Sequence, residues 1–147
     1  MTYQAITGSL ALLLLGLTSC TDEGADTAGQ DVVQAPVCFA YNGRGDTVHL
    51  ALTSGTGEVN GTLAYALAEK DRNSGTLRGG WSGDTLLAVY TFNSEGSISK
   101  REVAFLRRGQ GLVEGYGPLT ADGRAFTSRD SLNFPGGMPL SAVDCSE

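Results

Sequence analysis

The clearest pattern in the chain is the alternation of apolar residues along two neighbouring segments, Asp84–Phe92 and Ile98–Arg108. The first contains no Pro or Gly and is rich in β-branched and aromatic residues, which favours a strand over a helix. One of its faces carries Leu86, Ala88, Tyr90 and Phe92. The other face is also partly apolar, so we expect a central strand that is covered on both sides. Between the two segments, Asn93–Ser99 contains Gly96 and three serines, which predicts a turn.

Shorter segments with the same two-residue period lie before and after this hairpin: Val37–Tyr41, Thr47–Leu52, Val59–Leu67, Gly75–Trp81 and Leu112–Tyr116. No segment has a convincing helical period. The pattern predicts an all-β fold, a single antiparallel meander of about 7–8 strands that forms a barrel or a sandwich. Gly61 and Gly79, inside strands, predict bends or bulges that curve the sheet.

The C-terminal part of the chain is less regular. Ala125–Phe134 fits either an eighth strand or an irregular cover. Pro135–Pro139 contains two prolines and two glycines and cannot be regular structure. We expect Leu140–Cys145 to pack back beside Cys38.

The N-terminal segment Met1–Ser19 has an apolar core, Ala5–Leu17, that is too short to span a membrane. It is followed by Cys20, with Leu and two small residues directly before it. This segment resembles a bacterial lipoprotein signal peptide with its lipobox, which implies cleavage before Cys20 and lipid on its thiol. The alternative is an ordinary secretory signal with a chance cysteine at its end.

Residues 20–36 are polar and contain four acids without a base, Asp22, Glu23, Asp26 and Asp31. Such a composition predicts a flexible tether between a membrane anchor and a domain at 37–147. Thr21–Glu23 is similar to the surface-export signal of Bacteroidota lipoproteins, although a simple soluble linker explains it as well. We therefore expect a cell-envelope protein on the outer membrane, at its periplasmic face or on the cell surface.

The charge distribution argues against nucleic acid as a partner. The formal net charge is −6, from 16 acids and 10 bases. Since four of the acids lie in 20–36, the rest of the chain has 12 acids against 10 bases. A nucleic-acid binder needs a basic face, which this balance does not provide.

The three cysteines divide by position. Cys20 ends the signal segment, and Cys38 and Cys145 bracket the predicted domain. In an exported protein the latter pair predicts a disulfide. A metal site is not expected, because His49 is the sole histidine.

Polar residues near strand ends form the candidate binding site. They are Tyr65, Glu69, Asp71, Tyr90, Glu95, Arg101, Glu114 and Tyr116. Carboxylates near an arginine and phenols can line a pocket for a small ligand or grip a partner. The alternative is a set of solvated ion pairs at turns, each of little energetic value. No P-loop, dinucleotide fingerprint or nucleophile elbow is present, so we expect no cofactor and no catalytic residue.

The run EKDRNSGTLRG…GDTLLAVYTFNSEGSISKREVAFL…GLVEGYGP is similar to a family of small, largely uncharacterised lipoproteins of Bacteroidota. The resemblance implies a membrane-anchored β-domain and supplies no activity or site residues. The architecture is also similar to lipocalin-like barrels and to lipoprotein lysozyme inhibitors, although the motif of the inhibitors is not apparent.

Three functions follow as hypotheses. The first is a non-enzymatic, lipid-anchored binding module for a small ligand or an envelope protein. The second is an inhibitor of a cell-wall hydrolase that inserts Glu69–Ser74 or Asn93–Ser99 into the enzyme's cleft. The third is an enzyme with carboxylate chemistry.

Intact mass spectrometry of the protein from its native membrane tests the anchor. We expect a chain that begins at Cys20 with a diacyl or triacyl mass. Cys38 and Cys145 should be alkylated only after reduction. An unlipidated chain with free thiols would contradict the envelope localisation.

Overall fold

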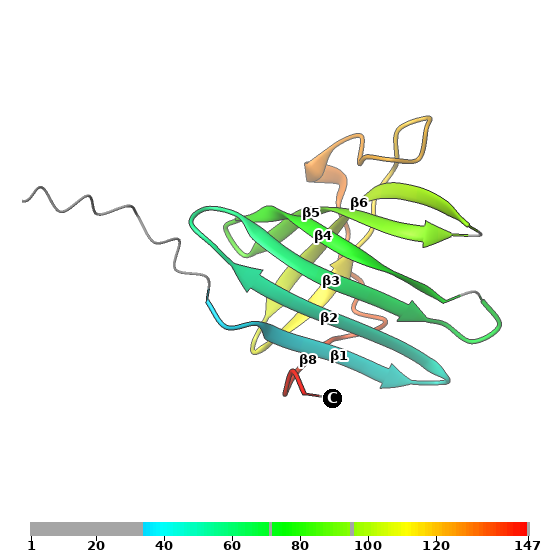
Figure 1. The fold of residues 1–147 in the computed structure, drawn as a ribbon. Coiled ribbons are helices and arrows are strands. Elements are labelled where there is room, and N and C mark those ends of the chain that lie inside the picture. Colours follow the sequence, from blue (N-terminus) through cyan, green and yellow to red (C-terminus); the bar gives the residue numbers. More distant parts are fainter. Residues whose placement is uncertain (1–33, 71, 95, 147) are drawn as a thin grey trace, which may run out of the picture. The chain divides into compact units, whose positions relative to one another are not determined.

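The computed structural model describes residues 34–70, 72–94 and 96–146, and these residues form an all-β fold (Figure 1). Eight antiparallel strands make one sheet. They are β1 (Val37–Gly43), β2 (Asp46–Ser54), β3 (Val59–Ala66), β4 (Asn73–Ser82), β5 (Thr85–Ser94), β6 (Ser97–Arg108), β7 (Gly111–Gly115) and β8 (Ser141–Val143). Seven of them agree with the segments that the apolar pattern predicts.

The sheet is a nearly closed barrel. Strands β1 to β7 pair in sequence order, and β8 returns to pair with β1. The two edges meet through one residue pair, Leu112 of β7 and Leu140 just before β8. Each of these residues donates its backbone N–H to the other's carbonyl oxygen at 2.9 Å. Of the two architectures left open by the sequence, the barrel is confirmed.

The barrel is closed at only one of its ends. Strand β6 pairs with β7 over Ala104–Arg108, and its first half has no strand beside it on that side. Strand β1 likewise pairs with β8 only over Cys38–Ala40. We call the end near the Leu112–Leu140 pair the closed end and the opposite end the open end. The β1–β2 and β5–β6 hairpins project at the open end (Figure 1).

Tight hairpin turns keep sequential strands adjacent. Arg44 and Gly45 join β1 to β2, with φ angles of 58° and 84°. Positive φ at both central residues is the geometry of the two-residue turn whose twist matches that of paired strands.

The interior is packed with apolar side chains along the middle of the barrel. They are Val48, Leu50, Leu52, Val59, Leu63, Leu77, Leu86, Ala88, Val103, Phe105, Leu112 and Leu140, with Tyr65 and Tyr90. The face of β5 that carries Leu86, Ala88 and Tyr90 turns inward. The expected cover on its outer face is not observed at Val89, which is 42% exposed, because in a barrel only one face of each strand turns inward.

Inward-facing glycines on β3 and β4 let the sheet curl tightly. A Cβ at Gly61 would meet the carbonyl oxygen of Ala51, and one at Gly79 would meet that of Leu87. The register runs through both positions without interruption, so these glycines mark close backbone approach and not bulges. Gly75 has the same role against Thr91.

An irregular segment covers the outer face of β6 and β7. It contains only a short 3-10 turn, η1 (Arg129–Ser131), so Ala125–Phe134 is a cover and not the eighth strand. The Phe134 ring lies where a Cβ on Gly115 would stand. Glu102 holds the segment through its backbone N–H, which donates to the Arg124 carbonyl at 2.7 Å. Its carboxylate accepts from Phe126 N–H at 2.8 Å.

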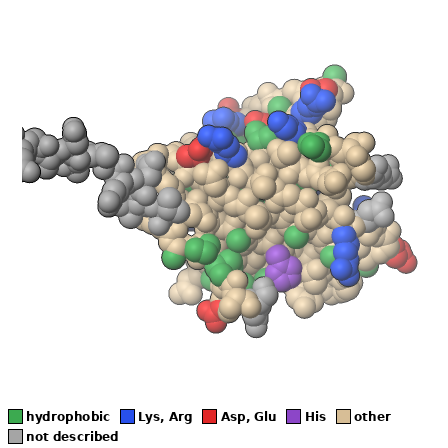
Figure 2. Space-filling view, viewed as in Figure 1, with side chains coloured by type: hydrophobic (Ala, Val, Ile, Leu, Met, Phe, Trp, Pro, Cys, Tyr) green, Lys and Arg blue, Asp and Glu red, His purple; other side chains and the backbone are tan. Residues whose placement is uncertain are grey.

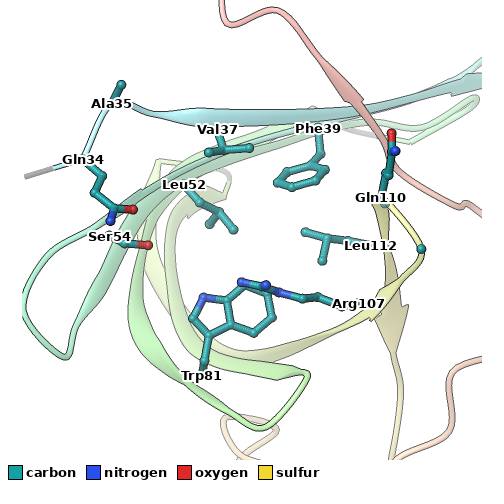
Figure 3. Close-up of a pocket in the computed structure, with 12 residues that line it drawn as sticks. Gln34, Ala35, Val37, Phe39, Leu52, Ser54, Trp81, Arg107, Gln110 and Leu112 are labelled. Atoms are coloured by element: carbon teal, nitrogen blue, oxygen red, sulfur yellow. The ribbon is translucent and has the colours of Figure 1, made fainter.

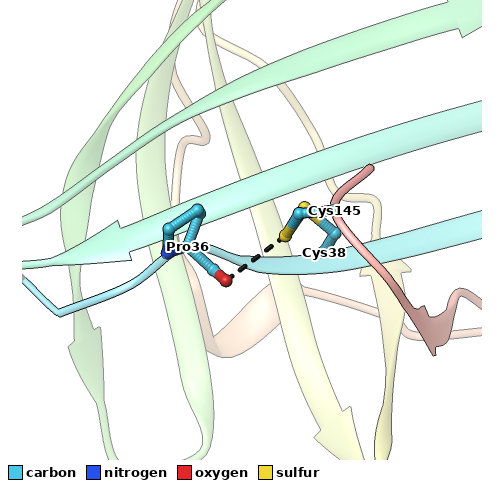
Figure 4. The surroundings of a disulfide bond; sticks show 3 residues. All are labelled: Pro36, Cys38 and Cys145. Carbon is cyan, nitrogen blue, oxygen red and sulfur yellow. Dashed lines mark hydrogen bonds between the residues drawn. A yellow bond between two sulfur atoms is a disulfide. The ribbon is translucent and has the colours of Figure 1, made fainter. Parts of the chain in front are cut away.

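The predicted Cys38–Cys145 disulfide is confirmed, and it joins β1 to the residues that follow β8. The bond spans 107 positions of sequence. Closing a loop of that length contributes about 4–5 kcal/mol in the chain-entropy model. The Cys145 sulfur lies 3.2 Å from the carbonyl oxygen of Pro36 (Figure 4). A disulfide sulfur carries no hydrogen to donate, so this is a packing contact.

The predicted signal peptide at 1–19, Cys20 and the tether up to residue 33 lie outside the described residues. Within the described ranges, no helix has the length and hydropathy needed to cross a membrane. On the face shown in Figure 2, acidic and basic side chains are interspersed and do not gather into a field of one sign.

Substituting Gly75→Ala tests the close strand approach. The added methyl would point at Phe92 Cα, 2.7 Å away, as well as at the Thr91 carbonyl. Because both atoms belong to backbone, we expect a loss of about 1–3 kcal/mol in the free energy of unfolding, measured with urea. The matched control is Gly137→Ala, since a Cβ there meets no atom within 4 Å. Equal stability of the two variants would contradict this packing.

Candidate functional site

The open half of the barrel brings together five of the predicted site residues. Tyr65 comes from β3, Tyr90 from β5, Arg101 from β6 and Glu114 from β7, and Tyr116 follows β7. Register explains why they meet inside. Arg101 pairs with the inward Tyr90, and Glu114 pairs with the inward Phe105, so both face the interior. We call these five residues the polar cluster.

Two phenols hold the Glu114 carboxylate. Tyr65 Oη donates to Oε1 at 2.7 Å, and Tyr116 Oη donates to Oε2 at 3.0 Å. Glu114 is only 8% exposed. Among the described residues, no other charged side chain is buried to this degree. A buried carboxylate is costly unless its oxygens accept hydrogen bonds, and here each oxygen accepts one.

Burial sets the protonation of the polar cluster. It raises the pKa of Glu114 above its ordinary value, and the two phenol hydrogen bonds and the Arg101 charge only partly oppose this. Burial and the Glu114 charge raise the pKa of both Tyr65 and Tyr116. Burial also raises the pKa of Tyr90 to about 12. The phenols therefore stay protonated at neutral pH and can act as donors.

Arg101 lies among aromatic rings. Its guanidinium carbon is 5.7 Å from the centre of the Tyr65 ring, 5.8 Å from that of Tyr90 and 5.5 Å from that of Phe92. Such contacts stabilise a cation through the ring quadrupole. Two polar atoms of the cluster have no hydrogen-bond partner, Tyr90 Oη and Arg101 Nε.

Of the three remaining predicted site residues, Glu69 is described, and it does not join the polar cluster. Glu69 lies in the β3–β4 loop with φ of 59° and lines an exposed depression with Lys70, Asn73 and Ser94. Asp71 and Glu95 lie outside the described residues. Glu69 and Lys70 are exposed in this loop. Their exposure fits the alternative interpretation, in which the charged residues at the turns are solvated and form no binding site.

A second site, which the sequence did not indicate, lies at the closed end. It is a pocket of about 310 Å³. Its apolar walls come from Val37, Phe39, Leu52, Trp81 and Leu112, whose side chains converge in Figure 3. Gln34 and Ser54 lie at its rim. Its volume lies at the lower end of the range for small-ligand pockets, about 300–1,000 Å³.

Arg107 provides the charge of this pocket. It pairs with the inward Leu112, and its guanidinium carbon lies 4.1 Å from the centre of the Trp81 ring. Among the described residues Arg107 has no ion pair; the one observed joins Arg78 and Glu58 on the surface. In the sequence, Arg107 and Arg108 look like a charged strand end. Only the pairing with β7 distinguishes the inward arginine from its neighbour.

No group of three or more His, Cys, Asp or Glu side chains within the described ranges is arranged to hold a metal ion.

No protein-family model, curated protein sequence or solved structure is significantly similar to this chain. The resemblance to Bacteroidota lipoproteins therefore stays a prediction. The fold and the two sites define the class of the molecule: an eight-stranded antiparallel β-barrel with an apolar, cationic pocket at its closed end and a buried polar cluster at its open end.

Proposed function

We propose that the protein is a lipid-anchored, non-enzymatic binding module of the cell envelope, and that its closed-end pocket binds a small amphiphilic anion. The observation that carries the proposal is the guanidinium of Arg107, which has no ion pair among the described residues and lies beside the apolar wall of the pocket. An acidic head group on the ligand would pair with that cation, and an apolar body would lie against Phe39, Leu52 and Trp81.

The dimensions of the pocket limit the ligand. A water-sized group occupies about 30 Å³ in a liquid, so about ten such groups fill the observed volume. A medium-chain carboxylate has this size. Removal of its chain from water supplies binding energy of about 25 cal/mol per Å² of apolar surface, and the charge-assisted hydrogen bond to Arg107 fixes its orientation.

One structural feature supports the envelope setting. The Cys38–Cys145 disulfide is typical of an oxidising compartment outside the cytosol.

The two other hypotheses stay predictions. The inhibitor hypothesis required a barrel that is filled and a loop that protrudes. The middle of the barrel is filled and the β5–β6 hairpin projects at the open end (Figure 1), so these two features fit the inhibitor hypothesis as well. For carboxylate chemistry, Glu114 has both oxygens engaged by phenols, which fits a structural or binding role better than proton transfer.

Octanoate provides a direct test because Trp81 is the sole tryptophan of the chain. We expect a saturable change in tryptophan fluorescence with octanoate and none with octylammonium, which has the same tail and the opposite charge. Calorimetry should show an affinity for octanoate about tenfold lower in Arg107→Gln than in the unmodified protein, because the variant loses about one charge-assisted hydrogen bond to the ligand.

The matched control is Arg108→Gln, which changes the net charge equally. Arg108 is the chain neighbour of Arg107, but its guanidinium is 3.4 Å from the Phe134 carbonyl. It should leave octanoate affinity unchanged. Equal binding of octylammonium, or equal loss in both variants, would contradict the proposed ligand class.

A further inference from the structure

We propose that the Cys38–Cys145 disulfide is a thiol-sensitive switch of the closed-end pocket, and that a dithiol reductant opens the pocket by releasing β8 from β1. In the oxidised chain the two walls of the pocket are held together, and in the reduced chain they separate. The resulting loss of ligand rests on the proposed function of this pocket. The separation of the walls can be measured without a ligand.

The first observation is the place where the disulfide joins β1. Val37 and Phe39 line the pocket (Figure 3), and Cys38 lies between them in the chain. Successive side chains of a strand point to opposite faces, so Cys38 turns to the outer face of the barrel. On that face, a groove of about 260 Å³ is lined by both cysteines and by the exposed His49. The disulfide therefore holds, from outside, the part of β1 that forms one wall of the pocket.

The second observation is that the opposite wall lies across the seam of the barrel. It comes from β7 and the turn before it, where Gln110, Gly111 and Leu112 line the pocket. Leu112 also forms the seam, through its two backbone hydrogen bonds with Leu140. Within the described strands, backbone pairing joins the β1 wall to the β7 wall at this side only through β8 and Leu140.

Strand β8 is the least secured strand of the barrel. It pairs with β1 only over Cys38–Ala40, whereas β2 pairs with β1 over Val37–Gly43. None of the three residues of β8 is buried. Once the disulfide is broken, Leu140 is the buried side chain that still anchors this end of the chain. Terminal segments with few buried contacts open before the central strands, so reduction should release β8 first.

The disulfide is accessible to a reductant, because Cys145 is exposed and Cys38 is half-buried. A thiolate of the dithiol attacks the Cys145 sulfur, the S–S bond breaks, and Cys38 leaves as a thiolate that takes up a proton. The second thiol of the reductant gives up its proton and displaces Cys145 from the mixed disulfide, so that Cys145 leaves as a thiol. Two electrons thus pass from the dithiol, which becomes a disulfide, to the two cysteines.

Trp81 reports the opening without a ligand, since it lines the pocket and is the sole tryptophan of the chain. The test uses the mature chain, with dithiothreitol as the reductant and acrylamide as the quencher of tryptophan fluorescence. We expect a larger Stern–Volmer constant after reduction than before. If about 90% of the reduced chains are open, the affinity for octanoate falls about tenfold, because only the closed fraction binds.

The matched control is the double variant Cys38→Ser, Cys145→Ser, which lacks the disulfide and keeps Cys20. It should show the Trp81 quenching of the reduced chain both with and without dithiothreitol. Amide exchange in β3 to β5 should stay slow in the variant and in the reduced chain, because the switch opens one end of the barrel and leaves the central strands paired.

Unchanged quenching of Trp81 after reduction would overturn the proposal. Rapid exchange throughout β3 to β5 would overturn it as well, since the disulfide would then hold the whole fold and not one pocket. A response of the double variant to dithiothreitol would show that the reductant acts elsewhere and would contradict the switch. If the oxidised chain fails to bind octanoate while Trp81 quenching still rises on reduction, the proposed ligand is wrong and the switch is supported.

Discussion

The pairing of Leu112 with Leu140 is the constraint on which the barrel depends. A meander of seven strands would otherwise leave two exposed edges, β1 and β7, each a row of unpaired backbone groups. The short β8 pairs with the β1 edge, and the two hydrogen bonds between Leu112 and Leu140 join this edge of the sheet to β7. The Cys38–Cys145 disulfide holds β8 against β1 from the other side. Closure at one end thus relies on few interactions, and a covalent bond supports them.

Incomplete closure gives the two ends different chemistry. At the closed end, the converging strands form a small apolar pocket in which Arg107 stacks on Trp81. At the open end, β7 is too short to cover β6, and the interior there is polar. Glu114, Arg101 and three tyrosines replace the aliphatic side chains of the middle. The packed core between the ends separates the pocket from the polar cluster.

The strands could be predicted from sequence because each depends on local two-residue alternation. The expected packing of Leu140–Cys145 beside Cys38 is also confirmed, since a disulfide between Cys38 and Cys145 requires these segments to meet. Barrel closure could not be predicted, because it depends on one pair of residues 28 positions apart, Leu112 and Leu140. The segment that covers β6 and β7 has no regular alternation of apolar and polar residues. The sequence therefore could not decide between a strand and an irregular cover for Ala125–Phe134.

The candidate site could be predicted only in part, because contacts between distant strands decide which of the predicted residues meet. Tyr65 and Glu114 are 49 residues apart, so their contact depends on the register of the whole sheet and not on a local pattern. Glu69 was grouped with them only because it lies near a strand end, and the loop carries it to the surface. The place of Arg107 in the pocket could not be predicted, because an exposed charge at a strand end usually contacts solvent alone, and Arg107 is itself exposed. Its inward direction follows from pairing with Leu112, which no local pattern shows.

Backbone hydrogen exchange at Leu112 and Leu140 tests the closure of the barrel most directly. In the oxidised protein, we expect both amides to exchange slowly, like those of the central strands, because each donates to the other residue's carbonyl. After reduction of the disulfide, protection at Leu140 should fall while that of β3 to β5 persists. Rapid exchange of both amides in the oxidised protein would show that the sheet is open and would contradict this account.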